Sequence, residues 1–249
     1  MQIVVNQLMT RYDIAGKGKT VLLLHGWGDN LDGLRGLQNA LATHYKVISL
    51  DLPGFGHTQA PPSVWNLDDY ATFVAAFLQK IGLTSLAGLV GHSNGGALAI
   101  RAVSLGVLSP QKLVLLAASG IRTTQSSRRM LLSATAKIGK GTTFWLPERY
   151  RRILRQRLYT AAGSDMLVVP HLQETFKVTV RQDVQADAAT ITLPTLLVYA
   201  KDDRAVPVAD GETYHKLITN SELHTLPGGH FVHLEHADTV AKAITEFLR

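Results

Sequence analysis

The chain contains no cysteine among its 249 residues. This absence excludes a disulfide framework, a thiolate metal site and a cysteine nucleophile. A chain that needs no disulfides suits a reducing compartment, and we expect a cytoplasmic protein. The first residues do not combine a basic segment with an apolar one, so we expect no signal peptide.

Long apolar runs are also missing. No run approaches the roughly 18 consecutive apolar residues that a membrane-spanning helix requires, so we expect no transmembrane segment. The chain is nevertheless 46% hydrophobic, which is enough to bury a sizeable core. Its length suits one α/β domain that carries an insertion as well as it suits two small domains.

Acidic residues are scarce in one part of the chain. The net charge is +6, but residues 121–160 hold ten basic residues and a single acid, Glu148. These arginines either face a substrate pocket or an anionic surface, or they form the solvated face of helices. The alternation of Arg151, Arg152 and Arg155 with apolar residues favours the solvated face. No nucleic-acid-binding motif accompanies this charge, and we expect no nucleic-acid partner.

Short apolar runs alternate with helix-like segments along most of the chain. Strands that are apolar on both faces indicate a mostly parallel sheet covered by helices on both sides. The first two runs predict a hairpin. The expected strands are 3–5, 9–14, 21–24, 46–50, 86–90, 113–116, 196–199 and 222–226.

The helical segments have period-3.6 patterns. The clearest covers 67–81, where Asn66 supplies an N-cap. Residues 121–189 have helical periodicity without a convincing pair of strands. We therefore predict a helical insertion over 121–189 and a core formed by 1–120 and 190–249.

Gly91-His92-Ser93-Asn94-Gly95 lies between a predicted strand and a predicted helix. A G-x-S-x-G pattern in that context is typical of a nucleophile elbow, where a sharp turn exposes a serine hydroxyl. Glycines are needed because a Cβ at either flanking position would collide with neighbouring backbone.

A serine hydroxyl needs a base, and the base needs a group that orients it. His230 follows the predicted strand 222–226, and Asp202 and Asp203 follow the strand 196–199. The residues alone leave both aspartates open as the orienting acid, and the one that does not orient the imidazole is expected to be a solvated or capping residue.

Five motifs in this order resemble the α/β-hydrolase superfamily, in particular its serine esterase-like branch with a helical cap. They are His25-Gly26-Trp27-Gly28, Asp51-Leu52-Pro53-Gly54-Phe55-Gly56, the elbow, the Asp203 loop and the Gly229-His230-Phe231 loop. The resemblance covers nearly the whole chain. It implies an eight-stranded, mostly parallel sheet with a helical cap inserted after strand 6.

The resemblance also implies roles for single residues. Ser93 is the expected nucleophile, His230 the general base and Asp203 the acid that orients it. The backbone N–H groups of Trp27 and Asn94 are the expected oxyanion hole. Residues expected to support these loops are His25, Gly26, Gly28, Gly91 and Gly95.

The other histidines have simpler interpretations. His92 is expected to point away from the site and to pack. His233 and His236 follow His230 at spacings that suggest a metal site, but no acidic cluster accompanies them in the sequence. We therefore expect no metal ion and no cofactor.

These observations predict a serine hydrolase that cleaves a small or medium carboxylic ester through an acyl-enzyme on Ser93. Similar triads serve thioesterases, carbon–carbon bond hydrolases, lactonases, perhydrolases and acyltransferases, and these alternatives stay open. A ligand receptor that retains the triad is the non-enzymatic alternative.

Overall fold

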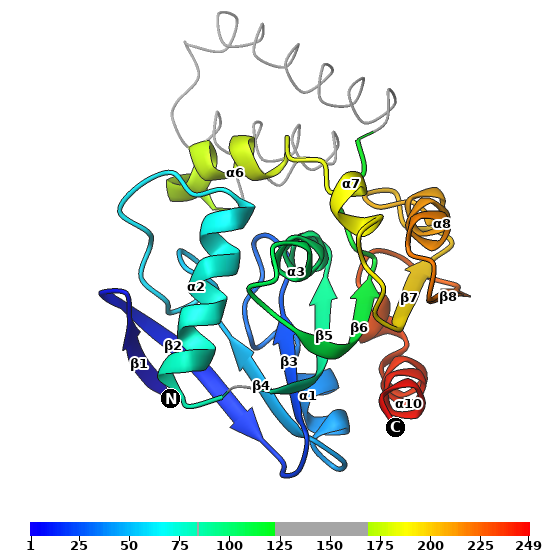
Figure 1. Cartoon of the computed structure of the whole chain (residues 1–249), viewed down its shortest axis with the longest axis horizontal. Helices are drawn as coiled ribbons and strands as arrows, with labels where there is room; N and C mark the ends of the chain where they lie inside the picture. Colours follow the sequence, from blue (N-terminus) through cyan, green and yellow to red (C-terminus); the bar gives the residue numbers. More distant parts are fainter. Residues whose placement is uncertain (84, 123–168) are drawn as a thin grey trace, which may run out of the picture.

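A computed structural model describes residues 1–83, 85–122 and 169–249, and an eight-stranded sheet forms its centre (Figure 1). The strand order is β1-β2-β4-β3-β5-β6-β7-β8. Strand β2 pairs antiparallel with β1 and β4, and every other pair is parallel. The predicted eight-stranded, mostly parallel sheet is thereby confirmed. The strands are β1 (Gln2–Val5), β2 (Leu8–Ala15), β3 (Thr20–Leu24), β4 (Lys46–Leu50), β5 (Leu86–His92), β6 (Pro110–Leu116), β7 (Thr195–Ala200) and β8 (Ser221–Leu226).

The central strands are buried on both faces, as their apolar sequences predict. In β3, Leu22 and Leu24 join one hydrophobic cluster, whereas Val21 and Leu23 join a second cluster on the opposite face. This division follows from the alternation of side chains along a strand. The sheet therefore needs a layer of helices on each side.

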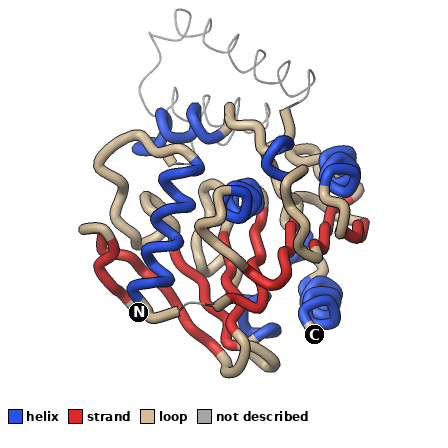
Figure 2. Tube along the Cα trace, viewed as in Figure 1, coloured by secondary structure: helices blue, strands red, loops and turns tan. Residues whose placement is uncertain are grey.

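Helices supply both layers (Figure 2). The first cluster includes side chains from α2 (Leu67–Lys80), α3 (Asn94–Ser104) and α8 (Val208–Leu217), and the second includes side chains from α1 (Arg35–Leu41) and α10 (Ala237–Leu248). A short helix, α9 (Val232–Glu235), precedes α10. In the described part of the chain, no helix is long and apolar enough to cross a bilayer.

Helix α2 begins as the sequence predicts. The side chain of Asn66 accepts hydrogen bonds from the N–H groups of Asp68 and Asp69, and Asp69 accepts one from the N–H of Asn66. This reciprocal capping box fixes the first turn of the helix. The helix ends at Lys80, one residue before the predicted limit.

The segment between β6 and β7 is described only at its two ends. Its described part contains η3 (Pro170–Leu172), α6 (Gln173–Thr179) and α7 (Gln185–Ala188), and no strand. Most of the basic window, including Arg151, Arg152 and Arg155, lies outside the described residues. The division into core and cap therefore stays a prediction.

One arginine ties α7 to the core. Arg101 of α3 donates to Asp68 of α2 and to Asp187 of α7, each at 2.7 Å. The same oxygen of Asp187 accepts from the Ser104 hydroxyl at 2.8 Å. The chain that returns to β7 is thus fixed against the two helices that flank the elbow.

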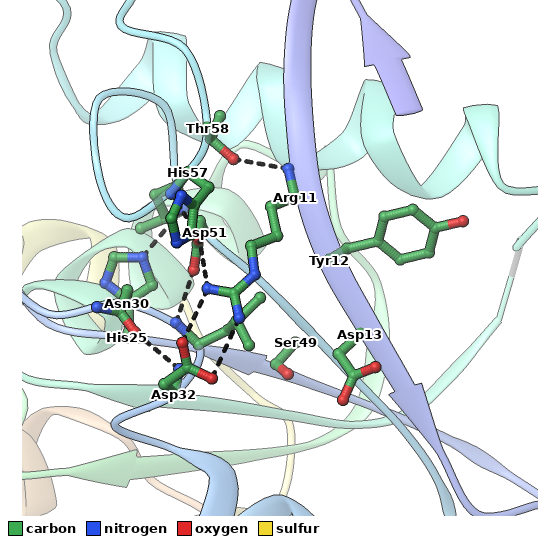
Figure 3. A network of polar contacts seen from close by, with 12 residues as sticks. Arg11, Tyr12, Asp13, His25, Asn30, Asp32, Ser49, Asp51, His57 and Thr58 are labelled. Carbon is green, nitrogen blue, oxygen red and sulfur yellow. Dashed lines mark hydrogen bonds and ion pairs between the residues drawn. The ribbon is translucent and has the colours of Figure 1, made fainter. Parts of the chain in front are cut away.

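A second polar network joins the loops that follow β3 and β4 (Figure 3). The buried carboxylate of Asp51 accepts from the backbone N–H groups of Leu31 and His57, each at 2.8 Å. Arg11 of β2 reaches Asp51 at 3.5 Å and Asp32 at 2.8 Å. This network fixes the loop after β3, which carries His25 to Gly28.

Candidate active site

Ser93 forms the turn between β5 and α3 and has an unusual backbone conformation. Its φ is 52° and its ψ is −118°, which is strained for a non-glycine residue. Backbone hydrogen bonds keep Ser93 in this strained conformation. Ser93 donates its N–H to Leu116 at 3.0 Å, and its carbonyl accepts from Gly96, Ala97 and Ser119.

The flanking glycines allow the backbone to approach this closely. A Cβ on Gly91 would lie 2.4 Å from the carbonyl oxygen of Gly95. A Cβ on Gly95 would lie 2.4 Å from the carbonyl oxygen of Leu24, at the end of β3. Any larger residue at these two positions would push the helix away from the sheet.

Ser93, His230 and Asp203 come together although they are far apart in the sequence. The distance from Ser93 Oγ to His230 Nε2 is 2.9 Å, and that from His230 Nδ1 to Asp203 Oδ2 is 2.7 Å. The carboxylate only accepts, so Nδ1 carries a proton and Nε2 is left to accept the serine hydroxyl proton. This is the arrangement that activates a serine nucleophile.

The structure separates the two adjacent aspartates. The Asp203 side chain is fully buried, and its second oxygen accepts from the N–H groups of Ala205 and Val206 at 2.8 and 2.9 Å. Asp202 is exposed, and it accepts from the N–H of Gly228 at 3.3 Å. Asp203 therefore contacts the imidazole, whereas Asp202 contacts the loop before it.

His25 holds the loop after β3. Its Nε2 accepts the N–H of Leu52 at 2.9 Å, so its Nδ1 carries the proton and donates to the carbonyl of Gly26 at 2.8 Å. Burial lowers the pKa of this imidazole, so it stays neutral. A Cβ on Gly26 would lie 3.1 Å from the Cβ of Ser93, which places this loop directly against the elbow.

Two backbone N–H groups near Ser93 are available as donors. Those of Trp27 and Asn94 form no hydrogen bond within the described residues. Asn94 is also the first residue of α3, where the helix dipole favours negative charge. The ring of Trp27 packs against Phe55 at 4.9 Å and Phe176 of α6 at 5.0 Å between centroids.

His92 makes a long-range contact that the sequence did not reveal. Its Nε2 donates to the backbone carbonyl of His230 at 3.0 Å, and the two rings lie 5.0 Å apart. The expectation of simple packing is incomplete, because the partner belongs to a loop 138 residues further along the chain. No local pattern could predict that contact.

His233 is fully buried beside His92, with 4.4 Å between the ring centroids. Burial is the main cause that lowers its pKa to about 4. Burial likewise holds the pKa of His92 well below its usual value. Of His230, His233 and His236, which are close together in the sequence, only His233 belongs to a group of possible metal ligands in the described residues. The three groups that converge are instead Asp29, His92 and His233.

Comparison with known proteins agrees with this geometry. The sequence model of the alpha/beta hydrolase family matches residues 21–243. The chain is 27% identical to 2-hydroxy-6-oxo-6-(2'-aminophenyl)hexa-2,4-dienoic acid hydrolase of Metapseudomonas resinovorans, over 96% of this chain and 87% of that protein. It is 28% identical to the pimeloyl-[acyl-carrier protein] methyl ester esterase of Xanthomonas campestris pv. campestris, over 95% and 97%.

A solved structure gives the same result. The solved structure of a serine hydrolase involved in carbazole degradation superposes on this chain with a TM-score of 0.77 at 27% identity. The match covers 100% of this chain and 97% of that one. The family match spans most of the chain and includes every strand from β3 to β8. The chain therefore belongs to the α/β-hydrolase family and is a hydrolase.

Proposed function

We propose that the chain cleaves small or medium carboxylic esters through an acyl-enzyme on Ser93. The observation that carries this proposal is the continuous relay from Ser93 Oγ through His230 to the buried Asp203, with distances of 2.9 and 2.7 Å. Both distances lie within the normal range of protein hydrogen bonds, so a proton can pass from Ser93 to His230 while Asp203 holds the imidazole.

The proposed reaction has two steps. Ser93 Oγ attacks the ester carbonyl while His230 takes the hydroxyl proton. The resulting oxyanion accepts hydrogen bonds from the backbone N–H groups of Trp27 and Asn94. His230 then protonates the departing alkoxide, which leaves as an alcohol. A water molecule attacks the acyl-enzyme by the same route, and it releases the acid and frees Ser93.

We also infer that residues 121–189 form a cap over this site, with residues 1–120 and 190–249 as the core. The described part of the segment supports this proposal, since Phe176 of α6 packs against Trp27 of the oxyanion loop. Their rings form an aromatic surface next to the loop that lies against the elbow, and such a surface suits a short or medium acyl chain. The basic residues between 123 and 168 lie outside the described residues.

A carbon–carbon bond hydrolase is the second candidate. It is favoured by the 27% identity, over 96% of this chain, to a hydrolase whose substrate is a 2-hydroxy-6-oxo-dienoic acid. Such a reaction releases a carbanion equivalent in place of an alkoxide. The serine relay itself is compatible with both, as it is with thioesters and lactones.

A substrate panel distinguishes these reactions. The purified chain is assayed on p-nitrophenyl esters of increasing acyl length, together with thioesters, lactones and a 2-hydroxy-6-oxo-dienoate, with Ser93→Ala as the control. We expect the highest kcat/KM on short and medium esters. A higher value on the dienoate would replace esterase by carbon–carbon bond hydrolase.

Covalent labelling separates an enzyme from a receptor that retains the triad. A fluorophosphonate probe is expected to modify Ser93, and His230→Ala is expected to slow that modification strongly. Labelling that is absent, or that is unaffected by His230→Ala, would contradict the catalytic assignment.

A further inference from the structure

Asp29, His92 and His233 form a compact cluster next to the triad but separate from it. Asp29 belongs to the loop after β3, His92 ends β5, and His233 belongs to α9. One side-chain oxygen or nitrogen from each lies within 4.8 Å of the other two. The proposed reaction uses none of these three atoms.

Three ring nitrogens of this cluster are buried without a hydrogen bond of normal geometry. His92 is 2% exposed and His233 is fully buried. No hydrogen bond of normal geometry reaches His92 Nδ1 or either ring nitrogen of His233, although a contact with the Gly33 backbone acts to raise the pKa of His233. A buried polar atom without a partner costs about 1–3 kcal/mol, so an ion bound through these nitrogens would recover part of that cost.

The hydrogen bonds that do exist fix which atoms are free to bind. His92 Nε2 donates to the carbonyl of His230, so Nδ1 has no proton and its lone pair is available. Asp29 Oδ1 accepts the N–H of Asn30 at 2.8 Å, which leaves the other oxygen for a ligand. The cluster therefore offers two uncharged imidazoles and one carboxylate.

We propose that Asp29, His92 and His233 bind one divalent transition-metal ion of the Zn²⁺ class. Two imidazoles and a carboxylate are a donor set that Zn²⁺ and similar ions take, with solvent as a further ligand. A tetrahedral Zn²⁺ holds its ligand atoms roughly 3.4 Å apart, which follows from bond lengths near 2.1 Å. The side chains would need to close by no more than about 1.4 Å, a movement that side-chain rotation supplies.

The hydrogen bond between His92 and the carbonyl of His230 would then be an outer contact of the metal site. A ligating histidine usually donates its other ring N–H to an oxygen, and that bond orients the ring. The same imidazole would thus connect the ion to the loop that carries the general base.

Metal titration of the full chain tests the proposal. After dialysis against a chelator, the protein is titrated with Zn²⁺ by calorimetry and with Co²⁺ by visible absorption. We expect one equivalent of tight binding, tetrahedral Co²⁺ bands and a rise in Tm with Zn²⁺. Asp29→Asn and His233→Ala are each expected to weaken binding by at least about tenfold, since even outer contacts of such sites are worth ~10–100-fold.

Two controls locate the ion. His224→Ala removes an exposed imidazole that lies 3.8 Å from Glu222, and Asp203→Asn removes the triad carboxylate. Both variants are expected to bind Zn²⁺ like the unchanged chain. Binding that is absent, that survives Asp29→Asn and His233→Ala, or that is lost in either control would overturn the proposal. Circular dichroism checks folding, and Asp29→Asn alone decides the result if His233→Ala does not fold.

Discussion

At the scale of single residues, the proposed catalytic relay depends on which of two adjacent carboxylates faces His230. Asp203 is buried and its Oδ2 accepts a hydrogen bond from His230 Nδ1–H, whereas Asp202 accepts one from the N–H of Gly228 in the neighbouring loop. The two side chains have the same chemistry, so a difference in kcat between a variant of one and the same variant of the other reports the position of the side chain alone.

Asp203→Asn is therefore expected to lower kcat about 10⁴-fold, because an amide stabilises the wrong tautomer of the imidazole. Asp202→Asn is the matched control, and it is expected to change kcat less than about threefold. Steady-state kinetics on one ester substrate measure both. Equal losses in the two variants would refute the assignment of Asp203.

Gly26 provides a second test at this scale. A methyl group there would meet His92 Nδ1 and Ser93 Cβ, both at 3.1 Å, and would displace the loop that carries the Trp27 N–H. We expect Gly26→Ala to lower kcat by about 10²–10³-fold, the usual cost of losing one oxyanion donor.

Gly36→Ala is its control. Gly36 lies within α1, and an added methyl group there meets nothing within 4 Å in the described part of the chain. This variant is expected to keep its kcat and to gain about 0.5–1 kcal/mol in unfolding free energy, because alanine favours the helix. A loss of kcat as large as that of Gly26→Ala would show that the effect of Gly26→Ala does not come from the loop that carries Trp27.

At the scale of secondary-structure elements, Arg101 connects α2, α3 and α7 through Asp68 and Asp187. The hydrogen bond from Arg101 is the main cause that lowers the pKa of Asp68 below its ordinary value of 3.8. A carboxyl whose pKa is lower in the folded state stabilises the fold above its unfolded pKa. That contribution is lost as the pH falls through the folded pKa.

Asp68→Asn is accordingly expected to destabilise the chain near neutral pH, and the difference from the unchanged chain is expected to fade below about pH 4. The Asp68 side chain is 42% exposed, so solvent screening keeps the effect below about 1 kcal/mol. Urea unfolding at several pH values measures it. A difference that persists or grows in acid would contradict the role of the ion pair.

At the scale of the whole molecule, the charge distribution is the feature most open to test. The basic window 121–160 carries a net +9, and the rest of the chain carries −3. The sequence pattern favours arginines on a solvated helix face, which would leave substrate entry unaffected by their charge.

We therefore expect added salt to change kcat/KM by the same factor for a neutral ester and for an anionic ester with the same leaving group. The Debye length falls from about 10 Å at 0.1 M to about 3 Å at 1 M, so charge steering would be suppressed over this range. If added salt lowered kcat/KM for the anionic ester alone, the arginines would be assigned to substrate attraction.

Much of the fold could be predicted because its signals are local. The apolar runs mark the strands, and Asn66 marks the start of α2. The G-x-S-x-G motif places Ser93 at a turn because only glycine tolerates the close approach of β3 to α3. The predicted mostly parallel sheet is confirmed, although several strands extend a residue or more beyond their apolar runs.

The sequence by itself predicted the fold class, and it proposed Ser93 as the nucleophile with an acid and a base after it in the chain. Only the tertiary structure decided which atoms meet. It separates Asp203 from Asp202, gives His92 a partner on the His230 loop, and brings Asp29, His92 and His233 together. The physical reason is that β3 and β5 are neighbours in the sheet while the loop after the edge strand β8 reaches across to His92, and no local pattern encodes contacts between segments that are distant in the chain.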